Sequence, residues 1–85
     1  MNVKELSVLA YANGYTVWNY REKVNTKDKI LEKNYFEDIV NILNEGDFIH
    51  ICIFKENKFI DYIGVVVSKI DINENIVEVK MVKGV

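Results

Sequence analysis

His50 and Cys52 are the two residues of this chain with the most versatile chemistry, and one residue separates them. A histidine and a cysteine on one face of a strand could act as base and nucleophile. The neighbouring sequence supplies no carboxylate to orient the histidine, and the run 48–54 is otherwise apolar. A thiol in apolar surroundings is usually unreactive. We therefore expect a structural histidine and an inert Cys52, and no catalytic pair.

The remaining polar residues offer no other catalytic set. One His and one Cys are too few for a zinc site unless subunits share ligands. The four glycines, at positions 14, 46, 64 and 84, are isolated, so the chain has no glycine-rich phosphate loop. We predict a protein that is not an enzyme, with no catalytic residues, no metal and no cofactor.

Paired carboxylates can act as general acids and bases. Glu37 and Asp38 fall where a helix is expected to begin, and acidic residues there complement the helix dipole. Asp71 and Glu74 fall in a predicted turn. Asp47 follows a glycine and is expected to accept hydrogen bonds from its own turn. Neither pair is expected to lie in an apolar cleft that would raise the pKa of a carboxyl group. Both pairs and Asp47 are therefore interpreted as structural.

Composition limits the class of protein further. The 85 residues carry a net charge of −2, and 49% of them are hydrophobic. Nucleic-acid-binding and membrane-surface proteins need a basic footprint, so neither partner is expected. Charged residues interrupt every apolar run before the roughly 20 residues of a membrane span, and the first five residues do not resemble a signal peptide. We expect one soluble domain over residues 1–85.

The region 12–21 combines a turn with a strand rich in aromatic residues. Asn13 and Gly14 suit a two-residue hairpin turn, so residues 6–12 and 15–20 are predicted to pair. With Ala12 opposite Tyr15, Leu9 would lie across from Trp18 and Ser7 across from Tyr20. Leu9, Tyr11, Trp18 and Tyr20 would then share one face, which must be buried.

A helical segment is predicted next. Thr26 suits an N-cap, so a helix is expected to begin near Lys27. A second apolar face follows at helical spacing: Phe36, Ile39, Val40 and Leu43. Asn34 favours two short helices over one continuous helix, because Asn readily adopts the left-handed conformation that ends a helix. Gly46 is expected to end the helical region.

The last third of the chain reads as three strands. Residues 48–54 are apolar on both faces, as in a central strand. Residues 59–70 form a long strand, in which Gly64 marks a bulge or a close backbone approach. Residues 76–82 alternate, with Val77, Val79 and Met81 inward, as on an edge strand.

These elements predict an α+β fold made mainly of antiparallel strands. Five strands of this length curl strongly. Two architectures remain open: a five-stranded curled sheet forming a half-open barrel, and a sandwich, in either case with a short helical insert between strands 2 and 3. The strand order is also open.

A binding role must rest on aromatic surface and on sheet edges. Tyr and Trp are favoured at protein interfaces because they combine rigid area with a polar tip. Trp18 could instead be the core anchor of the domain, and the edge strand 76–82 could pair with another chain unless Glu78 and Lys80 prevent it. The interface candidates are Tyr11, Trp18, Tyr20, Tyr35 and Tyr62.

In three of its segments the chain resembles a small module of bacteriophage and prophage virion proteins. The first is a strand of the form Gly-aromatic-x-x-Trp-x-Tyr, at residues 14–20. The second is a Tyr-Phe step at Tyr35 and Phe36, and the third is the strand entry Leu-x-x-Gly-Asp-x-Ile at residues 43–49. In order and spacing the resemblance covers roughly residues 6–54.

The resemblance implies a structural protein of a virion or phage-derived particle: a capsid decoration, a head-fibre or spike base, or a tail component. Such a protein is made in the host cytoplasm, works as a homo-oligomer and contacts other virion proteins. A trimer is expected first and a dimer second. The alternative is a small adaptor or regulatory module with an SH3-like barrel, which would bind a partner peptide in a groove formed by Trp18 and Tyr20.

Overall fold

The computed structural model describes residues 1–82. The N-terminal 3₁₀ turn η1 (Val3–Glu5) precedes two paired strands, a largely irregular crossover and three further strands. The elements after η1 are β1 (Leu6–Ala12), β2 (Tyr15–Glu22), the short helix α1 (Lys27–Ile30), the 3₁₀ turn η2 (Glu37–Ile39), β3 (Phe48–Lys55), β4 (Lys58–Asp71) and β5 (Ile76–Met81).

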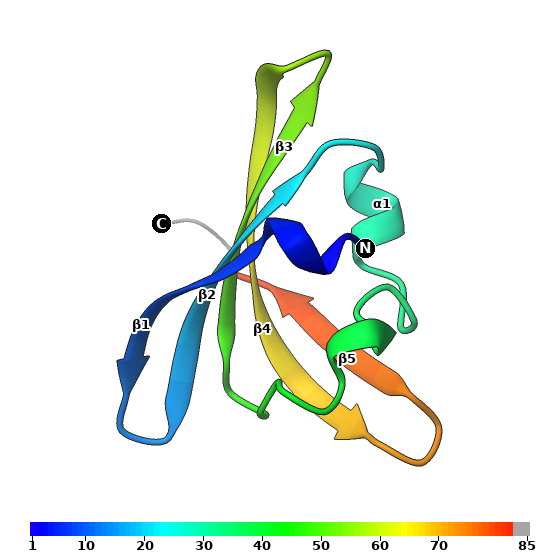
Figure 1. Cartoon of the computed structure of the whole chain (residues 1–85). Coiled ribbons are helices and arrows are strands. Elements are labelled where there is room, and N and C mark those ends of the chain that lie inside the picture. The colour runs from blue at the N-terminus through cyan, green and yellow to red at the C-terminus, as the bar shows by residue number, and fades with distance from the viewer. Residues whose placement is uncertain (83–85) are drawn as a thin grey trace.

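The five strands form one sheet in the order β1-β2-β3-β4-β5. Three neighbouring pairs are antiparallel, while β2 and β3 run parallel. The sheet is strongly twisted and open, and the crossover at residues 23–47 lies on one side of it (Figure 1). The predicted α+β class, mainly antiparallel with a helical insert between strands 2 and 3, is confirmed, and the sheet does not close into a barrel. No helix among residues 1–82 has the length and apolarity to cross a membrane.

The first hairpin forms where it was predicted, but half of its register is different. Ala12 lies opposite Tyr15, and Gly14 has a φ of +88° in the turn. A bulge between Val8 and Ala10 then shifts the pairing by one residue, so Val8 and not Leu9 lies opposite Trp18. A bulge adds a residue to one strand only. The predicted shared face of Leu9, Tyr11, Trp18 and Tyr20 is therefore wrong, and Leu9 and Tyr11 are exposed.

The crossover contains less helix than its apolar spacing indicated. Helix α1 begins at Lys27 as predicted, but Thr26 makes no side-chain cap and the helix has only four residues. The predicted break after α1 is confirmed, and the second segment has a single 3₁₀ turn. Its four apolar residues are nevertheless all buried, because consecutive turns present them to the sheet. Gly46, with φ +93°, lies in the turn before β3.

The last three strands follow the predicted meander, with β3 central and β5 at an edge. On β3 the isoleucines at 49, 51 and 53 are buried, and the alternate residues are half-exposed. Gly64 marks a close approach, because a Cβ there would lie 2.8 Å from the Phe48 ring. The register shifts of β4 lie elsewhere, between Val67 and Lys69 against β5 and between Phe59 and Asp61 against β3. Met81, predicted to point inward, is exposed at the end of the edge strand.

One apolar core fills the space between the inner face of the sheet and the crossover. Its buried residues are Trp18, Tyr20, Ile30, Tyr35, Phe36, Ile39, Val40, Leu43, Ile49, Ile51, Ile53, Ile63, Val65, Val67 and Val77.

Candidate functional site

The structure divides the five candidate interface rings into two groups. Trp18, Tyr20 and Tyr35 are buried in the core, whereas Tyr11 and Tyr62 are exposed. A buried ring has no surface left for a partner. Of the five candidates only Tyr11 and Tyr62 therefore remain available for binding, and the other three rings stabilise the fold.

Asp47 supplies the hydrogen-bond partner that the indole N–H of the buried Trp18 requires. Its carboxylate is fully buried and accepts hydrogen bonds from the indole N–H of Trp18 at 3.0 Å, the main-chain N–H of Thr16 at 2.9 Å and that of Asn44 at 3.0 Å. Its main-chain oxygen accepts from Val67 N at 2.9 Å. One side chain thus connects β2 to the turn before β3, and the main chain of the same residue connects that turn to β4. The predicted role of Asp47 within its own turn is confirmed for Asn44, but its bonds to β2 were not foreseen.

An aromatic cluster lies further along the inner face. The rings of Tyr35 and Phe36 meet edge to face at a centroid distance of 4.8 Å, and each lies 6.4 Å from the Tyr20 ring. The Tyr20 hydroxyl accepts a hydrogen bond from Asn2 N at 2.8 Å and lies 3.5 Å from the Tyr35 hydroxyl. Edge-to-face contacts of this kind add to the stabilisation from burial.

These contacts bring together the three segments that carry the resemblance to virion modules. Trp18 and Tyr20 come from the first, Tyr35 and Phe36 from the second, and Asp47 from the third, although up to 31 residues separate hydrogen-bonded partners. The shared residues therefore act as determinants of the fold. A partner would contact other residues.

Because the Tyr20 hydroxyl is buried, the stability of the fold varies with pH in the alkaline range. Burial raises its pKa; the hydrogen bond from Asn2 opposes this, and Glu22 and Glu5 add to it. An unfolded tyrosine ionises near pH 10, whereas the folded protein keeps this proton to higher pH. The stabilisation is therefore complete below about pH 10 and is lost as the pH rises further.

We expect the free energy of unfolding, measured by urea titration, to fall more steeply above pH 10 in the native protein than in Tyr20→Phe. The variant keeps the ring but has no proton to lose. Equal slopes in the two proteins would show that Tyr20 does not cause the alkaline loss.

The outer face of the sheet is apolar and is not part of the core. Its side chains alternate with the buried ones and are half-buried or exposed. Arg21 lies over the Phe54 ring, 4.5 Å from its centroid. We define the outer face by Val17 of β2, Phe48, His50, Cys52 and Phe54 of β3, and Tyr62 and Val66 of β4.

His50 is held on the outer face by a phenol. Its Nδ1 is hydrogen-bonded to the Tyr62 hydroxyl, and its ring meets Phe48 edge to face at 4.5 Å. Cys52 lies directly opposite Tyr62 in the β3–β4 pairing. Burial raises the pKa of Tyr62, and the neighbouring thiol raises it further. The hydrogen-bond partner of His50 Nδ1 is thus a phenol and not a carboxylate or a thiol, and the two side chains form a cross-strand pair. No three His, Cys, Asp or Glu side chains within the described residues could hold a metal ion.

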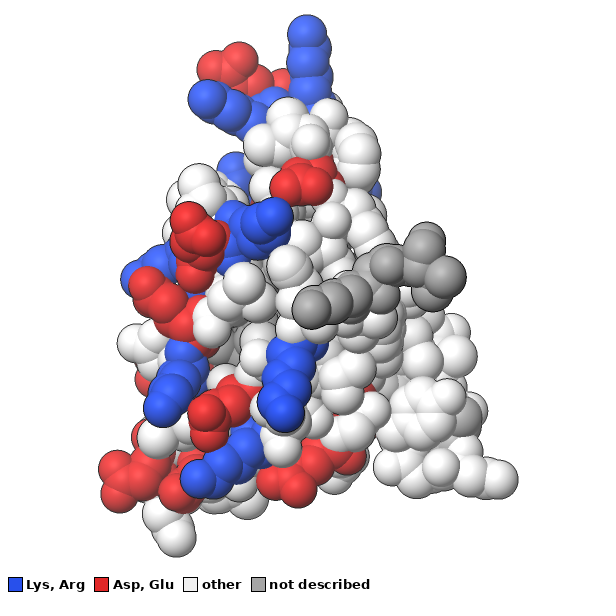
Figure 2. All heavy atoms as spheres, turned by 180° about the vertical axis from the view of Figure 1, so that it is seen from behind, with Lys and Arg blue, Asp and Glu red and all other residues white. Residues whose placement is uncertain are grey.

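The first hairpin carries four exposed apolar side chains. From Leu6 to Tyr20 the sequence has no charged residue. Tyr11 is 78% exposed, Val8 and Leu9 are each 57% exposed, and Tyr15 is 41% exposed. We call these four side chains the hairpin surface. Figure 2 shows Lys, Arg, Asp and Glu over the other side and the top of the molecule, and none over the lower right, where this hairpin lies.

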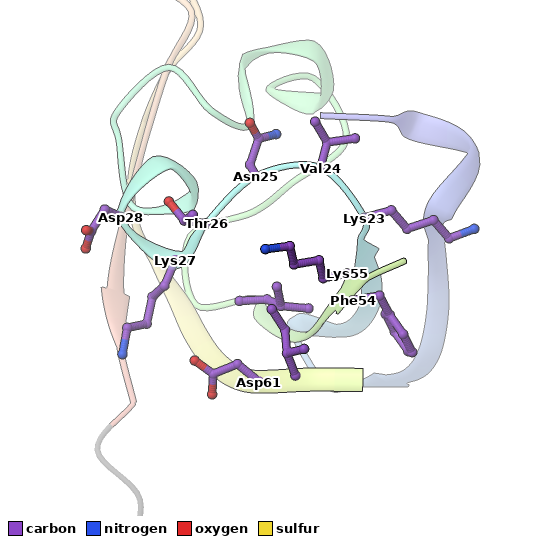
Figure 3. Close-up of a pocket in the computed structure, with 11 residues that line it drawn as sticks. Lys23, Val24, Asn25, Thr26, Lys27, Asp28, Phe54, Lys55 and Asp61 are labelled. Atoms are coloured by element: carbon purple, nitrogen blue, oxygen red, sulfur yellow. The ribbon is translucent and has the colours of Figure 1, made fainter. Parts of the chain in front are cut away.

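A pocket of about 460 Å³ opens where the crossover leaves the sheet. Figure 3 shows Lys55 across the middle of this space, with the Lys23 and Lys27 side chains directed away. Lys23 is bonded to Glu5 at 3.1 Å. The pocket is large enough for a small molecule, but its polar groups do not converge on one point, and we assign it no ligand. It is lined by residues 23–28, Ile53, Phe54, Lys55, Ile60 and Asp61.

Comparison with known proteins assigns this chain to no family. Searches of protein-family models, curated proteins and solved structures found no match. The interpretation of this chain therefore rests on its own surface. The hairpin surface was only partly predicted, since Tyr11 was named but Val8 and Tyr15 were not. The missing signal was the uncharged stretch at residues 6–20.

Proposed function

We propose that this chain is a non-enzymatic structural protein of a bacteriophage or phage-derived particle, and that it assembles through the hairpin surface and the outer face. The observation that carries the proposal is the uncharged, exposed hairpin. Large exposed apolar patches on soluble proteins usually mark interaction sites. A role as a capsid decoration, fibre or spike base, or tail component would bury this surface against neighbouring subunits.

Two further features support the proposal. The residues behind the resemblance to virion modules form one connected core, through the Trp18–Asp47 hydrogen bond and the rings of Tyr20, Tyr35 and Phe36. The polar residues within residues 1–82 form no recognisable catalytic set, since His50 is paired with Tyr62 and Asp47 with main-chain and indole donors. A peptide-binding adaptor is less well supported, because Trp18 and Tyr20 are buried and offer no groove.

The proposal is tested by asking whether the native protein travels with particles. Particles induced from the source culture are banded on a density gradient, and each fraction is probed with an antibody to this chain. We expect the chain to comigrate with intact particles and to remain bound after a high-salt wash, because an apolar contact is not screened by salt. A chain found only in the soluble fractions would overturn the proposal.

A further inference from the structure

The two edges of the sheet differ in a way that singles out β1. The other edge strand, β5, carries Glu78 and Lys80, and Glu78 lies 3.8 Å from Lys33. Strand β1 carries no charge and no proline over its seven residues. Natural proteins commonly protect free edges with charged residues, proline, covering segments or bulges. Within residues 1–82, the bulge near Leu9 is the one such device found at β1.

We infer that β1 is the docking edge for a second copy of this chain, through antiparallel pairing of the two β1 strands about a two-fold axis near Tyr11. This inference rests on the proposed function and specifies the partner. A two-fold interface brings each residue close to its own symmetry mate. Such pairing puts like charges together at any charged position near the axis, and an uncharged edge avoids that repulsion.

The exposed surface around β1 is suited to such a contact. A fully buried tyrosine removes on the order of 150–250 Å² from solvent, and a standard interface buries about 800 Å² per partner. Tyr11, Leu9 and Val8, which are all exposed, and the main-chain groups of β1 that face away from β2 supply part of that area. Tyr11, which pairs with Thr16 on β2, would face the Tyr11 ring of the second copy.

The bulge is compatible with this pairing. It leaves Leu9 without a residue opposite it on β2 and shifts the register on one side. Ala10, Tyr11 and Ala12 continue in regular pairing beyond it. These residues can therefore extend the sheet on their other side, and the result is one continuous ten-stranded sheet across two copies.

The test measures self-association of the full chain by sedimentation equilibrium over a wide concentration range. We expect a monomer–dimer equilibrium, and Tyr11→Lys should raise its dissociation constant about tenfold or more, because the dimer then holds two like charges near its axis. Two controls add the same charge elsewhere: Ile72→Lys in the exposed β4–β5 turn and Met81→Lys at the β5 edge. Both should dimerise as the native protein does. Far-ultraviolet circular dichroism verifies that each variant is folded, and Leu9→Lys is a second β1 variant should Tyr11→Lys fail to fold.

The outcomes test the β1 pairing and the proposed function separately. A dimer weakened by Tyr11→Lys or Leu9→Lys but not by the controls supports the β1 pairing. A dimer that only Met81→Lys weakens, a trimer, or a monomer at every concentration overturns it. A chain that is monomeric yet bound to particles keeps the proposed function without this pairing, whereas a monomer absent from particles overturns both.

Discussion

Replacement of Asp47 by alanine is expected to lower the free energy of unfolding by about 3–6 kcal/mol. The carboxylate accepts from three donors, Thr16 N, Asn44 N and the Trp18 indole. Without it the buried Thr16 N–H and Trp18 indole lose their partner, as does the part-buried Asn44 N–H, and each unsatisfied buried group costs about 1–3 kcal/mol. The total stability of a chain of 85 residues is roughly 4–13 kcal/mol. The variant should therefore lose a large part of its stability.

Urea unfolding followed by fluorescence measures this effect, since Trp18 is the only tryptophan and reports on the site itself. Asp61→Ala is the matched control, because Asp61 is exposed and accepts a hydrogen bond from the adjacent Tyr62 N at 2.8 Å. It should change stability by less than about 1 kcal/mol. Asp47→Asn keeps the shape but turns an amide donor toward one of the three donors, so we expect it to be destabilised as well. An Asp47→Ala variant as stable as the control would remove Asp47 from its central role.

Replacement of Phe36 by alanine should cost about 3–5 kcal/mol, the usual range for a large aromatic residue in a core. Phe36 is fully buried, and its ring packs edge to face against Tyr35 and Tyr20. Its removal leaves a cavity between the crossover and the sheet. Local hydrogen bonds hold the turns around Phe36 together, and the buried ring attaches these turns to the sheet.

Phe59→Ala is the comparison for this variant, since Phe59 is 59% exposed near the β3–β4 turn. It removes the same atoms from a site that water already reaches, and its effect should be much smaller. Phe36→Leu should fall between the two, because leucine fills part of the cavity. Both are measured by the midpoint and slope of urea unfolding. A loss of similar size at positions 36 and 59 would mean that the aromatic cluster does not anchor the crossover.

The sequence predicted strand and turn positions well because their signals are local. The alternation in residues 76–82, the two-sided apolar run at 48–54 and the Asn13–Gly14 turn are each visible within a few residues. The helical spacing at Phe36, Ile39, Val40 and Leu43 correctly predicted burial but overestimated helix. Tertiary contacts bury those side chains whether the backbone is α-helical or a series of turns, so periodicity alone did not separate the two.

The features that could not be predicted depend on contacts between distant residues. The bulge at Leu9 shifts one half of a hairpin whose other half was correct, and no residue type marks it. The link between Asp47 and Trp18 spans 29 positions, so the sequence around Trp18 favoured its core role without excluding the interface role. The candidate surface was hidden for the opposite reason. Its signal is an absence of charge over residues 6–20, which a search for chemically active residues passes over.

The parallel pairing of β2 with β3 has a consequence for how the chain reaches this structure. The β1–β2 hairpin and the β3–β5 meander can each close through short turns, but β2 and β3 meet only after the ends of residues 23–47 have been brought together. Long-range pairing is slow because the entropy of closing the loop is lost before its contacts form. Until that step the hairpin exposes both of its faces. A newly made chain therefore exposes this uncharged segment to other chains until β2 and β3 pair, and the speed of this step limits how much of the chain is lost to aggregation.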